Sequence, residues 1–119
     1  MQNRYQQLLT EVKQTIQEVD VQEVSQMDAN TCIIIDVRED NEWKKGHLPH
    51  AIHVSRGILE GNIERVAPDS QTQVVVYCAG GGRSALAAES LQRMGYNNVA
   101  SMRGGFGLWL QQGFPVATE

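Results

Sequence analysis

The chain has 119 residues, of which 41% are hydrophobic, and a formal net charge of −4. This length fits one domain with its own core, and two cysteines are too few for a disulfide framework. The mild acidity and the lack of a basic run disfavour nucleic-acid binding. No apolar run reaches the roughly 18 residues of a membrane span, and the polar first residues do not resemble a secretion signal, so we expect a cytoplasmic protein.

The first predicted element is an amphipathic helix. Six apolar residues recur at helical spacing among Gln, Glu and Lys, namely Tyr5, Leu8, Leu9, Val12, Ile16 and Val19. They predict a helix over about residues 4–18, and we divide the chain into this helix (1–18) and a domain (19–119). The stripe favours packing on the domain's own body, and contact with a second copy or a partner stays open as an alternative.

The first half of the domain shows several short elements. Asp20 and Glu23 have the spacing of a capping box, which predicts a short helix up to about residue 27. Residues 32–37 form a continuous, mostly β-branched run typical of a buried parallel strand, in which Cys32 is interpreted as a small buried hydrophobe. A helix at 39–45, a strand at 52–54 and a helix or irregular turn at 58–66 follow.

The stretch around Cys78 organises the second half. Residues 74–77 form an apolar strand that ends at Cys78, three glycines and Arg83 follow, and a helical pattern then continues to about residue 94. Gly95 has the position expected of a residue that ends a helix. A strand at 99–102, a turn at 103–105 and a helix at 106–112 complete the chain.

Strands alternate with helical stretches throughout, which predicts an α/β fold with a parallel sheet. The carboxyl ends of such strands meet at one edge, where ligands bind. We therefore expect residues 36–38, 78–83 and 103–105 to converge.

The residues around Cys78 suit a reactive thiol. Glycines allow positive φ angles and let backbone N–H groups turn inward, and with the helix N-terminus they form a nest for an anion. Such a setting favours the thiolate, and Arg83 adds a permanent positive charge. The pattern indicates a nucleophilic sulfur.

Four motifs follow one another along the chain: Ile35-Asp36-Val37-Arg38, the stretch from Glu42 to Ala51 that contains Gly46-His47-Leu48-Pro49, the loop from Tyr77 to Ser84, and Met102-Arg103-Gly104-Gly105 with the following Trp109. In this order, and over about residues 18–116, they resemble the single-domain rhodaneses. The resemblance implies a rhodanese-like three-layer fold: a central parallel sheet of about five strands flanked by helices, to which the N-terminal helix is an addition.

The resemblance also implies a function, in which Cys78 takes the sulfane sulfur of a donor such as thiosulfate as a persulfide. Cyanide, a small thiol or a protein thiol then accepts it. Asp36 is expected to brace the site by pairing with an arginine, and Arg38 either attracts the anionic donor or forms a salt bridge. Ser84 is interpreted as the N-cap of the following helix. The implied anion-binding loop consists of Ala79, Gly80, Gly81, Gly82, Arg83 and Ser84.

Three histidines repeat at every third position, at 47, 50 and 53. Pro49 interrupts them and no cysteine cluster accompanies them, so we predict no metal site, and no other cofactor is implied. A preformed thiolate needs no base, which disfavours His47 in that role. His50 and His53 differ from the residues that the family usually has at these positions. The difference affects the expected shape of this turn and not the expected sulfur chemistry.

Two other functions remain alternatives. The first is a phosphatase or arsenate reductase. Phosphatases that resemble this fold carry Cys-x5-Arg, whereas only four residues separate Cys78 from Arg83, and the tighter ring suits one sulfur atom better than phosphate. Rhodanese-like domains also serve as non-enzymatic binding modules, typically with the cysteine lost. Cys78 with its glycines and arginine favours an enzyme.

Overall fold

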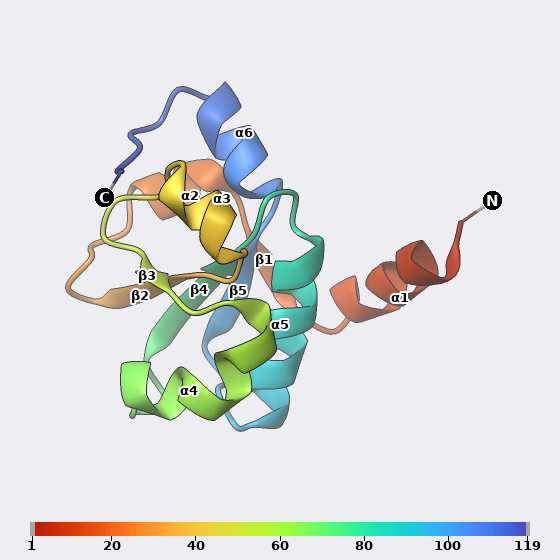
Figure 1. Ribbon diagram of the computed structural model, residues 1–119. Helices are drawn as coiled ribbons and strands as arrows, with labels where there is room; N and C mark the ends of the chain where they lie inside the picture. Colours follow the sequence, from red (N-terminus) through yellow and green to blue (C-terminus); the bar gives the residue numbers. More distant parts are fainter. Residues whose placement is uncertain (1, 119) are drawn as a thin grey trace.

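A five-stranded parallel sheet organises the computed structural model, which describes residues 2–118 (Figure 1). Its spatial order is β1-β5-β4-β2-β3, and every neighbouring pair is parallel, which confirms the predicted α/β architecture. Strand β4 therefore lies at the centre. The strands are β1 (Gln17–Val19), β2 (Cys32–Asp36), β3 (Ile52–His53), β4 (Gln73–Tyr77) and β5 (Val99–Met102).

The two central strands are the predicted β-branched runs. Ile35 of β2 and Val76 of β4 are paired in register and fully buried, as strands covered on both faces require. The same register sets Asp36 opposite Tyr77. The carboxyl ends of both strands thus lie level, and Cys78 follows immediately beyond this edge.

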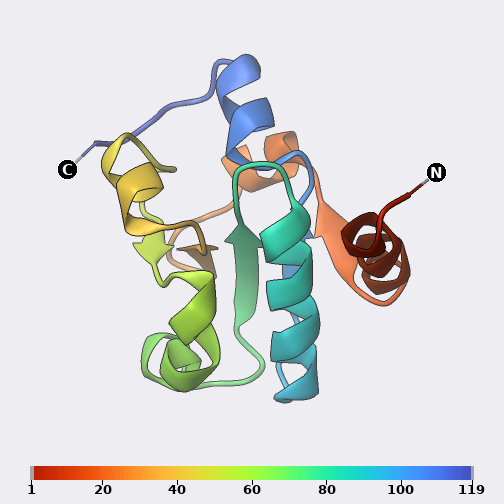
Figure 2. The same ribbon diagram turned by 45° about the vertical axis from the view of Figure 1, so that its right-hand side comes forward.

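Helices cover both faces of the sheet. α4 and α5 pack over one face and α2 and α6 over the other, each pair above its own apolar cluster (Figures 1 and 2). None of the helices within residues 2–118 has the length and apolar character needed to cross a lipid bilayer. The helices are α1 (Arg4–Lys13), α2 (Val21–Ser25), α3 (Asp40–Lys44), α4 (Leu59–Val66, after a 3-10 turn, Arg56–Ile58), α5 (Gly82–Arg93) and α6 (Gly105–Gln111).

Local signals set several helix ends correctly. Asp20 and Glu23 form the predicted capping box of α2, each accepting a hydrogen bond from the other's backbone N–H. Gly95 follows α5 with φ +99°, a conformation that glycine adopts without Cβ strain. Most other helix and strand ends agree with the prediction to within two residues. The small differences arise because fraying ends carry little sequence signal.

The N-terminal helix is shorter than the predicted range of 4–18. α1 ends at Lys13, and residues 17–19 instead form β1, which pairs with β5 from Gln17–Ala100 to Val19–Met102. Pairing with β5 gives this short, half-buried segment backbone partners that outweigh its helical periodicity. The predicted boundary between residues 18 and 19 therefore falls within β1.

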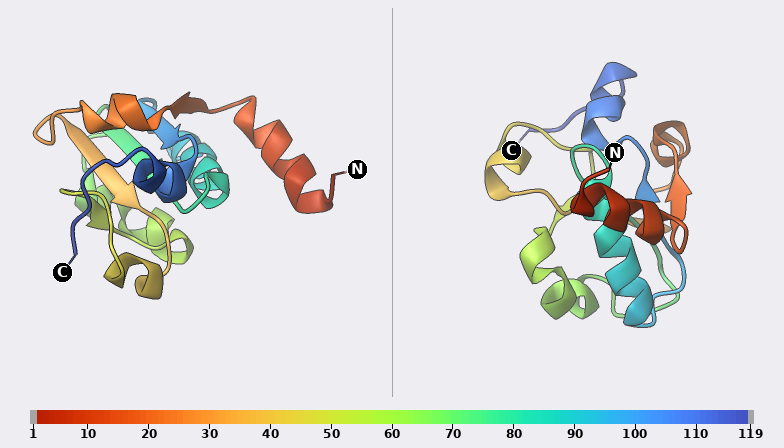
Figure 3. Two further views of the ribbon diagram at one scale, coloured as in Figure 1. Left: turned by 90° about the horizontal axis from the view of Figure 1, so that it is seen from above. Right: turned by 90° about the vertical axis from the view of Figure 1, so that its right-hand side faces the viewer.

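α1 itself projects from the body (Figure 3). Of its residues only Val12 is buried, whereas Tyr5 and Leu8 are 49% and 46% exposed. The helix touches the body at the start of α5, where Tyr5 and Leu9 lie over Gly82 and leave no room for a Cβ atom there. The third loop glycine thus accommodates α1.

Candidate active site

Cys78 lies in the turn between the central strand and its following helix. Strand β4 runs into a tight loop that leads directly to α5, as Figure 2 shows. Ala79 and Gly80 are exposed at the tip of the loop, and Gly81, with φ +103°, turns the chain into the helix. The residue Cys78 is only 1% exposed, so its sulfur lies beneath the loop.

The loop directs hydrogen-bond donors at this sulfur. The backbone N–H of Gly81 donates to Cys78 Sγ at 3.1 Å and that of Ser84 at 3.4 Å. The Ser84 hydroxyl lies 3.5 Å from the sulfur and 2.8 Å from the hydroxyl of Ser101 on β5. These contacts form the anion nest that the glycines predicted.

The hydrogen bonds to the Cys78 sulfur lower its pKa by more than burial raises it. Burial alone raises the pKa of Cys78, but the Ser84 hydroxyl and the backbone N–H groups of Ser84, Gly81 and Gly80 lower it, and the net pKa lies below the ordinary value. Cys32 shows the opposite case, because burial without such donors raises its pKa. Only Cys78 therefore has the surroundings of a reactive thiolate.

Ser84 does not cap the helix, which corrects the sequence interpretation. α5 begins at Gly82, and its N-cap is Gly81 in the left-handed conformation. Ser84 is thus the third helical residue, where both its backbone N–H and its hydroxyl point at the sulfur. A serine after a glycine run fits a cap signal equally well, and only the positive φ of Gly81 separates the two readings.

The first turn of α6 holds the loop through two backbone hydrogen bonds. Phe106 N–H donates to the Cys78 carbonyl at 2.8 Å, and Gly107 N–H donates to the Ala79 carbonyl at 3.0 Å. This approach requires glycine at position 105, where a Cβ atom would lie 2.5 Å from the Cys78 carbonyl oxygen. The predicted convergence of residues 78–83 with 103–105 is therefore confirmed.

Arg83 pairs with an acid that the sequence did not indicate as its partner. Its two terminal nitrogens donate to the two carboxylate oxygens of Glu42 on α3, at 2.8 and 3.1 Å. These hydrogen bonds are the main reason that the pKa of Glu42 falls to about 2. The pair joins α3 to the first turn of α5.

Asp36 forms an ion pair with Arg38. Of the two roles expected for Arg38, attraction of the donor or a salt bridge, the structure shows the salt bridge. The Asp36 carboxylate also accepts a hydrogen bond of 2.6 Å from the hydroxyl of Tyr77, the residue before Cys78. Arg38 is only 4% exposed, with its guanidinium over the Phe106 ring at 4.3 Å. It is therefore a buried structural ion pair, and no guanidinium is left free there to attract a donor.

Tyr77 is a member of this network that sequence reasoning missed. Its hydroxyl accepts from the backbone N–H of Leu48 at 3.1 Å while donating to Asp36. Burial and the neighbouring Asp36 raise its pKa, which keeps the phenol protonated. A tyrosine at the end of a buried strand needs a polar partner, and this requirement is the signal that could have indicated the role.

Two of the three histidines, His47 and His53, stack on the ring of Trp43. The ring of Trp43 lies 3.5 Å from that of His47 and 5.0 Å from that of His53. His47 is buried, and within residues 2–118 its Nε2 has no hydrogen-bond partner. No group of three metal-ligating side chains occurs in the described part of the chain.

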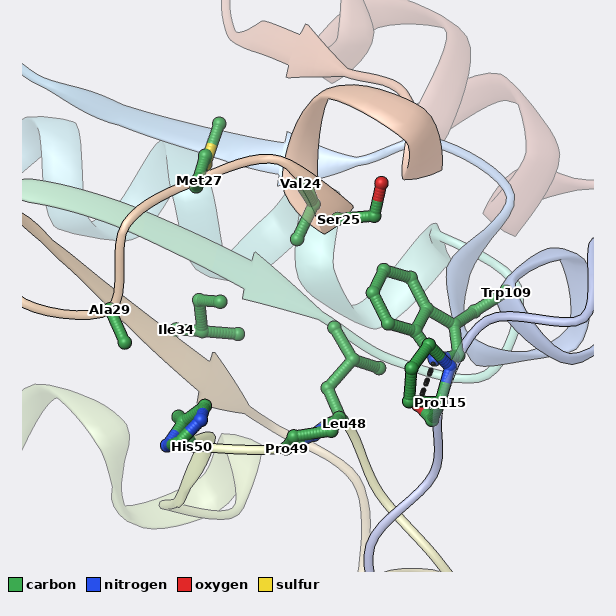
Figure 4. Close-up of a pocket in the computed structure, with 10 residues that line it drawn as sticks. All are labelled: Val24, Ser25, Met27, Ala29, Ile34, Leu48, Pro49, His50, Trp109 and Pro115. Atoms are coloured by element: carbon green, nitrogen blue, oxygen red, sulfur yellow. Dashed lines mark hydrogen bonds between the residues drawn. The ribbon is translucent and has the colours of Figure 1, made fainter.

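A separate hollow lies beside α2 and α6. It has a volume of about 210 Å³ and contains none of the loop residues 78–84 (Figure 4). Its walls are mostly apolar, and no lysine, arginine or carboxylate is among the described residues that line it. The lining residues are Val24, Ser25, Met27, Ala29, Ile34, Leu48, Pro49, His50, Trp109 and Pro115.

A parallel sheet between two layers of helices, with a cysteine in a glycine-rich loop after the central strand, is the arrangement that the sequence motifs led us to expect. Comparison with known families identifies the same class of protein. The model of the rhodanese-like domain family matches residues 11–112, so the chain belongs to this family. A sulfurtransferase of Allochromatium vinosum is 30% identical over 103 residues, which are 85% of this chain and 94% of the relative. Thiosulfate sulfurtransferase GlpE of Coxiella burnetii is 34% identical over 77 residues, 65% of this chain and 70% of the relative.

Two solved structures are similar throughout most of the chain. The protein RPA3614 of Rhodopseudomonas palustris, described as of unknown function and a possible tyrosine phosphatase, has a TM-score of 0.89 and 30% identity, covering 98% of this chain and 96% of its own. Thiosulfate sulfurtransferase from Pseudomonas aeruginosa has a TM-score of 0.82 and 31% identity, covering 92% of this chain and 22% of its own.

Proposed function

We propose that the protein is a sulfurtransferase that carries sulfane sulfur as a persulfide on Cys78. The observation that carries the proposal is the set of donors directed at the buried sulfur, from Gly81 N–H at 3.1 Å and from Ser84. The relatives named as sulfurtransferases support the class of activity. Thiosulfate is the donor that we propose as the first to test.

The first half-reaction loads the cysteine. The Cys78 thiolate attacks the outer sulfur of thiosulfate, a new sulfur–sulfur bond forms, and the bond to the sulfonate sulfur breaks with its electron pair leaving on sulfite. Charge is conserved, because a thiolate and a dianion become a persulfide anion and a dianion. The donors that hold the thiolate remain near the sulfur as charge moves outward by one atom.

The second half-reaction discharges the cysteine. Cyanide, or the thiolate form of a small thiol or of a partner protein's cysteine, attacks the outer persulfide sulfur, and the electron pair of the broken bond restores the Cys78 thiolate. The enzyme alternates between two covalent states, so ping-pong kinetics are expected. Neither half-reaction requires a general base once the thiolate exists.

The supporting residues act by holding the loop. The Asp36–Arg38 pair with Tyr77 fixes the end of β4, and the Glu42–Arg83 pair fixes the first turn of α5. Neither arginine presents an unpaired guanidinium to a tetrahedral oxyanion, and four residues separate Cys78 from Arg83. Both facts favour sulfur transfer over the phosphatase or arsenate-reductase alternative.

The test is to incubate the protein with thiosulfate and to measure its intact mass, beside a Cys78→Ser variant. We expect the wild type alone to gain one sulfur atom and to lose it to cyanide with release of thiocyanate. If folded wild type gains no sulfur from thiosulfate or from other sulfane donors, the sulfurtransferase function is refuted. Hydrolysis of an aryl phosphate by the wild type alone would favour the phosphatase, and capture of a partner without either activity would favour a binding module.

A further inference from the structure

The arginines at the carboxyl edge of the sheet are all neutralised. Four of them follow strands β2, β3, β4 and β5, and each lies within 4 Å of a carboxylate oxygen. The shortest contacts are 2.8 Å for three pairs and 3.5 Å for the fourth. The pairs are Arg38–Asp36, Arg56–Glu60, Arg83–Glu42 and Arg103–Glu18.

Glu42 is the acid of this group that binds an arginine of the reactive loop itself. It binds Arg83, one residue before Ser84, through both carboxylate oxygens. The backbone N–H of Glu39 donates to the same carboxylate at 3.0 Å, which fixes it at the start of α3. The two side chains are only 34% and 28% exposed, so water screens the pair incompletely.

We propose that Glu42 determines which charge the site accepts in a sulfur donor. By pairing with Arg83, the Glu42 carboxylate neutralises the positive charge that would attract a dianion to the loop beside Cys78. The site then gives dianions such as thiosulfate no electrostatic advantage over donors of lower negative charge. This inference rests on the proposed sulfurtransferase function and assigns to that function a residue that selects its substrate.

Two donors isolate the effect of charge. Thiosulfate and methanethiosulfonate both carry a terminal sulfane sulfur on a sulfonyl group, with two negative charges and one respectively. In both cases the Cys78 thiolate takes the terminal sulfur, and the electron pair of the broken bond leaves on sulfite or on methanesulfinate. A change in the ratio of their efficiencies therefore reports on donor charge, whereas a damaged nucleophile slows both alike.

The experiment measures kcat/KM for each donor, with cyanide as acceptor, in wild type and in Glu42→Gln, Glu42→Asp and Glu60→Gln. We expect Glu42→Gln to raise the thiosulfate-to-methanethiosulfonate ratio about tenfold, since one unit of charge near a partly buried site acts more strongly on a dianion. The change should appear mainly in KM. Glu42→Asp keeps the charge and should keep a ratio close to that of wild type.

Glu60→Gln is the matched control, because it removes the same charge from the Arg56 pair beside α4. An equal rise of the ratio in this variant would trace the effect to overall charge and overturn the assignment to Glu42. An unchanged ratio in Glu42→Gln, with both donors active, would also overturn it. Failure of both donors to load folded wild type would instead refute the sulfurtransferase function itself.

A measurement on the wild type alone keeps the proposal testable if Glu42→Gln does not fold. Added sodium chloride screens any net charge that the loop beside Cys78 presents to a donor. Because Glu42 neutralises Arg83, added salt should not lower the ratio of thiosulfate to methanethiosulfonate efficiency. A ratio that falls with salt would mean that the site attracts dianions, and this result would contradict the proposal.

Discussion

The hydroxyl of Ser84 lies between the sulfur of Cys78 and the hydroxyl of Ser101. When Cys78 is a thiolate, Ser84 must donate to it and accept from Ser101. Ser84→Ala should raise the pKa of the thiol, since a hydrogen bond to a charged group contributes about 1.5 kcal/mol, equivalent to about a tenfold loss of thiolate. The pH dependence of alkylation by iodoacetamide measures this change.

Ser101→Ala is the control for this prediction. Removal of the Ser101 hydroxyl leaves Ser84 free to donate to the sulfur, so its alkylation profile should lie between those of wild type and Ser84→Ala. If Ser84→Ala alkylates like wild type at every pH, the hydroxyl makes no contribution to the thiolate.

Position 105 requires glycine because it lies against the backbone of the loop that holds Cys78. A Cβ atom there would meet the carbonyls of Cys78 and Ala79, and the residue has φ +60°. Gly105→Ala should therefore lower the free energy of unfolding by about 3 kcal/mol through overpacking and left-handed strain. Urea denaturation measures the loss.

Gly61→Ala is the matched substitution, since Gly61 lies within α4 and nothing stands within 4 Å of its added Cβ. It should stabilise the protein by about 0.5–1 kcal/mol through helix propensity. A loss of stability in Gly105→Ala no larger than the effect of Gly61→Ala would mean that the loop and α6 can separate without cost.

Among the elements, α1 and β1 differ in how much the body depends on them. α1 buries only Val12, whereas β1 is paired along its whole length with β5. Deletion of residues 1–14 should leave a folded domain with a melting temperature only modestly reduced. Deletion of residues 1–19 should cost much more, because it exposes the edge of β5 and uncovers the apolar side chains under α2.

Thermal denaturation followed by circular dichroism compares the two truncations with the full chain. Equal melting temperatures for both would show that β1 adds nothing to the sheet. If the variant without residues 1–14 does not fold, α1 has a structural role that its exposure does not suggest.

The sequence predicted the elements whose signal is local. The β-branched runs of β2 and β4 gave the core strands, and the Asp20 capping box and Gly95 gave helix ends. β1 was missed because Gln17-Glu18-Val19 is short and polar, and only its pairing with β5 makes it a strand. Asn3 also caps α1 in a box with Gln6, a signal that was present and overlooked.

The candidate site divides in the same way. The glycine loop and Cys78 are carried by a motif and were expected, and so was an ion pair between Asp36 and an arginine, although Arg38 was not named as that arginine. Glu42 as the partner of Arg83 and Tyr77 as a partner of Asp36 were not expected, since each lies 41 residues from the side chain that it binds. Contacts of this separation follow from the sheet register, which the sequence does not state.

At the scale of the whole molecule, the Glu42–Arg83 pair links stability to pH. The pKa of Glu42 is about 2 in the folded protein and ordinarily 4.5. Since the folded value is the lower one, the stabilisation is complete above about pH 4.5 and is lost as the pH falls towards 2. The difference in unfolding free energy between wild type and Glu42→Gln should therefore shrink over this range.

Urea titrations at pH 7, 4 and 2.5 measure this difference, with Glu11→Gln on the exposed surface of α1 as the control for the loss of one charge. A difference that stays constant from pH 7 to pH 2.5 would mean that Glu42 is not held ionised by Arg83 in the folded state.

The chain has two cysteines, and they lie at opposite ends of neighbouring strands. Cys32 begins β2 in register with Gln73, whereas Cys78 follows β4, about 16 Å further along the strand direction. A disulfide requires Cα atoms within about 7 Å, so Cys32 cannot act as a resolving thiol. Peroxide that reaches Cys78 would yield a sulfenic acid whose reduction needs a thiol from another molecule. Recovery from oxidation therefore follows the thiol supply of the surroundings rather than any chemistry within the chain.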